Sequence, residues 1–90
     1  MARQGWILTP EQSRAARGWL GWLQSDLAEK ATVSLRTVAA FERGEISPLP
    51  NNLSAMQRAF ESEGITLVFD EQGNPTGIMR GGSRSRAGAG

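Results

Sequence analysis

Apolar side chains recur at helical spacing in four blocks before Gly64, and the period changes to that of a strand after it. The first block opens with Thr9-Pro10-Glu11-Gln12, which is typical of a helix start: Thr9 can cap, Pro10 suits the first turn and Gln12 can complete a capping box. The pattern predicts a helix from Pro10 to about Leu20, ending near Gly21. It predicts a second short helix from about Gln24 to Lys30, with a buried side formed by Leu27, Ala28 and Ala31.

Cap residues delimit two further helices. Ser34 is a good N-cap for the third helix, and Gly44 suits the position just after its end. The two prolines of Ser47-Pro48-Leu49-Pro50 predict a loop, after which Asn51 or Asn52 can cap the fourth helix. That helix carries one apolar stripe, formed by Leu53, Met56 and Phe60 at i, i+3 and i+7.

The chain after Gly64 has the composition of a hairpin. Residues 65–69 are rich in strand formers, 70–75 in turn formers, and 77–80 can form a second short strand. Residues 81–90 contain no large apolar side chain and are expected to be a disordered tail. We therefore expect a mainly α fold, a compact four-helix bundle over residues 1–64 followed by a short C-terminal hairpin over residues 65–80.

The second and third predicted helices are separated only by about three residues, 31–33. So short a connection forces the sharp angle of a helix-turn-helix. On a helical wheel with about 100° per residue, Val38 and Phe41 point inward, whereas Arg36, Ala40 and Arg43 point outward. Arginine can bridge guanine O6 and N7 or bind phosphate, and alanine can contact a thymine methyl group. This face therefore suits the DNA major groove; an ordinary solvated helix surface is the alternative.

Composition excludes most catalytic chemistry. The 90 residues contain no cysteine and no histidine, so thiolate catalysis, imidazole bases and the usual zinc sites are absent. No enzymatic activity, metal or cofactor is expected, and the lack of cysteine fits a cytoplasmic location. No apolar run is long enough for an export signal or a membrane span. Residues 1–79 hold seven basic and nine acidic side chains, so a role in DNA binding must depend on local placement of charge.

Residues 9–64 resemble the lambda-repressor/Cro-like helix-turn-helix family, often called the XRE family. The resemblance is carried by Gln24 at the start of the second helix, LAEKA at 27–31, Val33-Ser34, Val38, and FERG at 41–44. It implies that Gln24 touches a phosphate and braces the recognition helix, and that Arg17 and Glu42 form a partly buried ion pair. The implied contacts with base edges or the adjacent backbone come from Ser34, Leu35, Arg36, Thr37 and Ala40. Further backbone contacts are implied for Arg43, Asn51 and Asn52.

Three residues depart from the family pattern. Thr32 stands where a turn glycine is preferred, so a β-branched residue is either strained or placed in another conformation. Leu23 stands at the usual Ser/Thr cap position, which removes a side-chain cap worth about 1 kcal/mol. Leu35 stands at a position that is usually polar and base-reading, and it can offer only apolar contact.

Two sets of apolar side chains, the tryptophans and those of residues 65–69, need packing partners. Trp6, Trp19 and Trp22 are expected to pack in the core rather than to stack on nucleotides. Ile65, Leu67 and Phe69 are expected to pair with the same segment of a second chain, because an isolated hairpin is marginal in water. The alternative is that this segment packs back on the first and fourth helices.

These patterns together predict a cytoplasmic, sequence-specific transcriptional regulator. It is expected to bind the major groove of double-stranded DNA as a homodimer and to repress from a palindromic operator. The alternative is an antitoxin-like or anti-activator module that binds a different protein.

Overall fold

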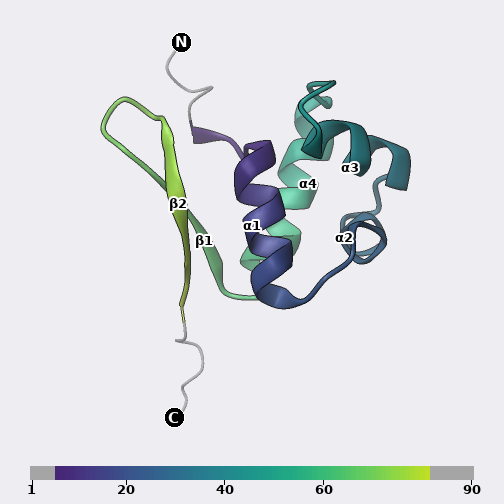
Figure 1. Ribbon diagram of the computed structural model, residues 1–90, viewed down its shortest axis with the longest axis horizontal. Coiled ribbons are helices and arrows are strands. Elements are labelled where there is room, and N and C mark those ends of the chain that lie inside the picture. Colours follow the sequence, from purple (N-terminus) through teal and green to yellow (C-terminus); the bar gives the residue numbers. More distant parts are fainter. Residues whose placement is uncertain (1–5, 82–90) are drawn as a thin grey trace.

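The computed structural model describes residues 6–81, which form four helices followed by an antiparallel hairpin (Figure 1). The elements are α1 (Pro10–Leu20), α2 (Gln24–Ala31), α3 (Leu35–Glu42), α4 (Pro50–Glu61), β1 (Ile65–Phe69) and β2 (Pro75–Arg80). The predicted mainly α class with a C-terminal hairpin is confirmed. The hairpin lies beside α1 on the side away from α2 and α3, as Figure 1 shows. Among residues 6–81, no helix is both long enough and apolar enough to cross a membrane.

Local capping sets both ends of α1 as predicted. The Thr9 hydroxyl accepts a hydrogen bond from the Gln12 N–H at 3.2 Å, and the Gln12 side-chain oxygen accepts one from the Thr9 N–H at 3.1 Å. Pro10 occupies the first turn, where its missing N–H leaves no unsatisfied partner. Gly21 ends the helix in the left-handed conformation, with φ 72°.

The α2–α3 turn places a β-branched residue in left-handed backbone. Thr32 has φ 57° and ψ 47°, and it is the one non-glycine residue with positive φ within residues 6–81. The Val33 N–H then donates to the Ala28 carbonyl at 2.9 Å, which closes the turn and starts the chain toward α3. At the other end of α2, Leu23 provides no side-chain cap, although Asp26 accepts a hydrogen bond from the Leu23 N–H at 2.8 Å.

The start of α4 differs from the prediction. The helix begins at Pro50 with Leu49 as N-cap, and Asn51 and Asn52 lie inside its first turn. Neither asparagine is therefore the cap. The second proline does not deny helix here, because proline is tolerated at the first helical position even though it restricts the residue before it.

A single apolar core joins the four helices to β1. It contains Leu8, Ala16, Leu27, Ala28, Ala31, Val38, Phe41, Leu53, Met56, Ala59, Phe60 and Ile65. Small residues stand where helices approach each other, so that Ala28 and Ala31 of α2 are buried together with Val38 of α3. The predicted apolar faces of α2 and α4 are thus both in the core.

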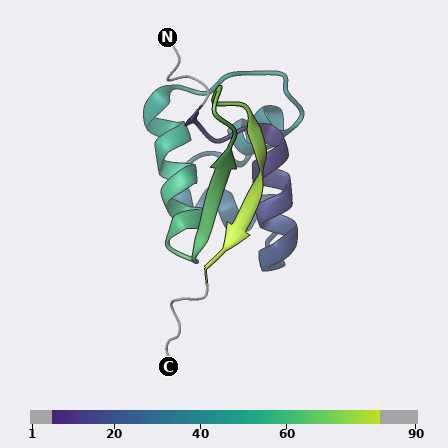
Figure 2. The same ribbon diagram turned by 90° about the vertical axis from the view of Figure 1, so that its left-hand side faces the viewer.

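The hairpin packs back on its own chain. Figure 2 shows it lying across α1 and α4, and the Gln12 side chain of α1 donates to the carbonyls of Val68 and Gly77 at 3.2 and 3.1 Å. Ile65 is 1% exposed, and Leu67 packs against the same core. Phe69 faces Trp6 with ring centroids 5.3 Å apart. Ile65, Leu67 and Phe69 are therefore engaged within the chain, and the expectation that Ile65 meets a second chain is wrong.

The tryptophans divide between core and surface. Trp22 packs against the core and stacks on Phe60, with ring centroids 5.7 Å apart. Trp19, in the last turn of α1, is 53% exposed, and Trp6 is also exposed. Core packing is therefore confirmed for Trp22 and wrong for the other two. The side of α1 that packs against its neighbours carries the small residues Ser13 and Ala16, which leaves Trp19 outside the closest contact.

The predicted tail at 81–90 lies outside the described residues except for Gly81. The Gly81 N–H donates to the Gly64 carbonyl at 2.7 Å, so this residue continues the hairpin ladder.

The strain at Thr32 gives a first prediction. Thr32→Gly should raise the free energy of unfolding by about 1 kcal/mol, because glycine adopts positive φ without a Cβ clash. Thr32→Asn should raise the free energy of unfolding by a smaller amount, since asparagine tolerates this conformation only partly. Urea titration of the three proteins measures the order, and a glycine variant no more stable than the parent would contradict the strain.

Candidate nucleic-acid interface

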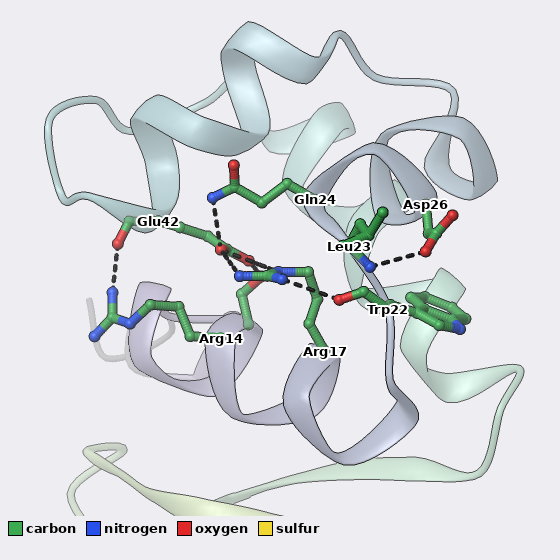
Figure 3. A network of polar contacts seen from close by, with 8 residues as sticks. Arg14, Arg17, Trp22, Leu23, Gln24, Asp26 and Glu42 are labelled. Atoms are coloured by element: carbon green, nitrogen blue, oxygen red, sulfur yellow. Dashed lines mark hydrogen bonds and ion pairs between the residues drawn. The ribbon is translucent and has the colours of Figure 1, made fainter.

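A buried carboxylate at the end of α3 ties three helices together (Figure 3). Glu42 is 2% exposed and accepts hydrogen bonds from side chains of both α1 and α2. The Ser13 hydroxyl donates at 2.5 Å, Arg17 Nη2 at 2.7 Å and Gln24 Nε2 at 3.1 Å. Arg17 Nε donates as well, at 2.9 Å to the second carboxylate oxygen. The carboxylate thus fixes the C-terminal end of α3 against α1 and the start of α2.

Two arginines of α1 complete this hydrogen-bond network around the end of α3. Arg17 faces Glu42 in a two-pronged ion pair and also donates through Nη1 to the Trp22 carbonyl at 3.0 Å. Arg14, one turn earlier, donates through Nη1 to the backbone carbonyl of Glu42. Cationic donors are favourable at a helix C-terminus, where the last carbonyls lack intrahelical partners. The sequence-implied pair of Arg17 and Glu42 is therefore part of a larger network.

The network controls the charge state of Glu42. Burial alone would raise the pKa of this carboxyl, but the hydrogen bonds from Arg17, Ser13 and Gln24 outweigh it and hold the pKa below the ordinary value. The hydrogen bond between Arg17 and Glu42 in turn raises the pKa of Arg17. Both groups are thus charged at neutral pH, and the pair offsets the cost of burying either charge alone.

Gln24 is positioned by this carboxylate at the first position of α2. Its Nε2 has two N–H donors, of which Glu42 takes one, and the half-buried side chain has surface left for another partner. A second N–H directed to a phosphate would give Gln24 both of the roles expected of it, bracing and contact.

The exposed ridge of α3 is formed by Leu35, Arg36, Ala39 and Arg43 (hereafter the α3 ridge). Leu35 is 50% exposed, Arg36 and Arg43 are exposed, and Ala39 is half-buried. Ala40 is only 9% exposed, so its predicted place on the outward face is wrong. The buried residues of α3 are Val38, Ala40, Phe41 and Glu42, and its exposed residues are Leu35 and Arg36.

The hydroxyls at the start of α3 are partly occupied. The Ser34 oxygen accepts from the Thr37 N–H at 3.1 Å and its hydroxyl donates to Thr37 Oγ1 at 2.9 Å.

Arg43 lies beside Glu45 in an exposed ion pair, at 2.8 Å between Nε and Oε2. Such an exposed pair is weak and can exchange partners.

Across the α3–α4 loop, Asn51 is exposed and Asn52 is half-buried in the first turn of α4. The predicted residues thus lie at the starts of α2 and α4 and along α3 up to its C-cap, Arg43.

Ser13 and Arg14 contribute to the network but were not predicted from the sequence. Ser13 is fully buried in α1 with no apolar signature, and its only signal was an i, i+4 spacing to Arg17. Arg14 resembles any exposed helical arginine until α3 is docked against it. Both gain their role from a partner 28 or 29 residues away in sequence.

Three features are typical of a helix-turn-helix DNA-binding domain. The turn between α2 and α3 is short, α3 carries exposed arginine, and the Arg17–Glu42 ion pair holds the end of α3 against α1. Residues 14–65, more than half of the chain, match the HTH_3 helix-turn-helix family, and the chain belongs to this family. It is therefore a DNA-binding regulator of the XRE type, and its family is one of regulators and not of enzymes. No curated protein matches the chain.

The Glu42 network gives a second prediction. Glu42→Gln should lower the free energy of unfolding at pH 7 by about 2–3 kcal/mol, because Arg17 loses its anionic partner. Since the folded-state pKa of Glu42 is lowered, its stabilisation is complete above the unfolded pKa of about 4.3 and is lost as pH falls through the folded value. The gap between the two proteins should therefore narrow below about pH 4.

Chemical denaturation from pH 7 down to acid measures this gap. Glu45→Gln is the matched control, because Glu45 is an exposed acid in an exposed pair and its loss should change stability far less. A gap that stays constant down to the lowest pH would contradict a charge-based role for Glu42.

Proposed function

We propose that this chain is a sequence-specific transcriptional repressor, located in the cytoplasm, that binds a palindromic operator as a homodimer. The observation that supports this most directly is the α3 ridge, whose arginines are exposed while Glu42 fixes the C-terminal end of the helix against α1 and α2. A rigid helix with exposed guanidinium groups can enter the major groove and keep its register there. Repression needs no more than occupancy of a promoter.

The residues divide into two roles in this proposal. Arg36 and Leu35 lie at the N-terminal end of α3 and contact base edges, with Ser34 and Thr37 at the neighbouring backbone. Phosphate contacts come from Gln24, from Arg43 once it releases Glu45, and from Asn51 and Asn52 with the amides of the α4 start. Ala40 has no part, because its side chain is covered.

A binding titration tests the role of Arg36. Arg36→Ala should weaken specific binding by about 1–3 kcal/mol while leaving the fold unchanged, because one bidentate base contact is lost. Fluorescence anisotropy with the chain's own upstream DNA and a scrambled duplex, each at two salt concentrations, separates specific from nonspecific binding.

Arg58→Ala is the matched control, since Arg58 is an exposed arginine in the last turn of α4. Equal losses of specific affinity in both variants would mean that the effect of Arg36→Ala comes from the change in net charge alone. Unchanged specific affinity in Arg36→Ala would remove this residue from the interface. Recovery of a different protein with the chain, with no preference for any duplex, would favour the interaction-module alternative.

For the homodimer we propose pairing along the outer edge of β2. This strand is the more exposed of the two, while β1 lies against α4 and the core. The Gly81–Gly64 hydrogen bond sets the alternation of the ladder, so the backbone groups of Ile78 and Arg80 point away from β1. A second copy there would give a symmetric four-stranded sheet in which this edge is covered.

Arg80→Pro tests this edge, because it removes an outward N–H and leaves the β1–β2 hydrogen bonds in place. The variant should shift the monomer–dimer equilibrium at least several-fold toward monomer. Arg80→Ala removes the same side chain but keeps the N–H, and it should leave the equilibrium near that of the parent. Sedimentation velocity over a concentration series measures all three proteins, and a parent chain that is monomeric throughout would overturn the dimer.

A further inference from the structure

The first residue of the recognition helix presents an apolar group where neighbouring positions offer polar ones. Leu35 is 50% exposed, and the half-buried Ala39 follows one turn later on the same side of α3. The two form an apolar strip alongside the arginines of the α3 ridge. A single exposed leucine is ordinary on a protein surface. Its place at the N-terminal end of α3 is what requires an explanation, since that end penetrates deepest into a major groove.

We infer that Leu35 recognises thymine through its C5-methyl group and so fixes one position of the operator. This inference rests on the proposed function. Among the groups that base pairs display in the major groove, the thymine methyl is the apolar one. An isobutyl group placed against the amino or carbonyl edges of the other bases would remove water from them without replacing their hydrogen bonds.

Neighbouring side chains strengthen this assignment. Ser34 donates its one O–H proton to Thr37 Oγ1 and accepts the Thr37 N–H, so it has no donor left for a base. The methyl group of Ala40, the other candidate for a thymine contact, is covered. Hydrogen-bond readout at this end of α3 therefore falls mainly to Arg36, and apolar readout to Leu35. The pair is suited to a guanine next to or near a thymine.

Removal of one methyl group from the DNA tests the inference. Duplexes selected by the whole chain from a random library are resynthesised with uracil in place of each thymine in turn, which deletes the C5-methyl and keeps base pairing. One substitution per half-site should weaken binding roughly three- to fivefold, the amount expected for one buried methyl group. Cytosine at that position should bind weakly, and 5-methylcytosine should recover part of the loss.

The protein side supplies the matched comparison. Leu35→Ala should bind the thymine and uracil duplexes equally, because the partner of the methyl group is gone. Leu49→Ala, a change at another exposed leucine, should keep the thymine–uracil difference. Selected duplexes that bind the parent chain without any methyl dependence, or a difference that survives in Leu35→Ala, would overturn the inference and leave the proposed function intact. If the library yields no preferred duplex, the proposed function itself fails, and the inference with it.

Discussion

The position of the recognition helix depends on one buried carboxylate. Glu42 has left water, a loss that is costly for an isolated charge, and it is tolerated because Arg17, Ser13 and Gln24 each donate to it. An apolar contact could hold α3 in the core equally strongly, but it would not define the rotation of the helix about its axis. Directed hydrogen bonds from two other helices define that rotation. The orientation of the exposed side of α3 is a consequence.

This rotation places Arg36 on the exposed side of α3. A wheel drawn from Val38 and Phe41 alone leaves Ala39 and Ala40 equally plausible as outward residues, because both apolar positions define only an approximate inner side. On the same wheel Glu42 lies about 60° from Ala39 and about 160° from Ala40, so the covered position of Ala40 does not follow from the inner side of α3. A buried acid whose partners are not adjacent in sequence is not visible in a hydrophobic pattern. Neither the burial of Glu42 nor that of Ala40 could therefore be predicted from the apolar pattern of α3 alone.

Local interactions were predictable and long-range packing was less so. The capping box of Thr9 and Gln12, the Ser34 cap, and the glycines after α1 and α3 involve residues within one turn, and each lies where the sequence indicated. The places of Trp19 and Ile65 depend on which elements cover them: Trp19 was expected in the core and is exposed, and Ile65 was expected to meet a second chain and is buried within its own. The Arg17–Glu42 contact was available beforehand only through resemblance to a family. Composition alone offers no reason to join an arginine of the first helix to a glutamate 25 residues later.

Net charge gives a misleading impression of how this domain meets DNA. The acidic balance of residues 1–79 argues against a polyanionic partner only if the carboxylates lie on the contact surface. Glu42 is neutralised by Arg17 and buried, and Asp70 is held in the hairpin turn by the backbone N–H groups of Gln72 and Asn74. Glu45, in contrast, is exposed and stands beside Arg43 on the surface. In the proposed complex, a phosphate that binds Arg43 competes with this carboxylate, and Glu45 would weaken nonspecific attraction at the α3 ridge. Under the proposed function, base contacts would then supply a larger share of the total affinity, which would favour selection of sequence over nonspecific binding to any duplex.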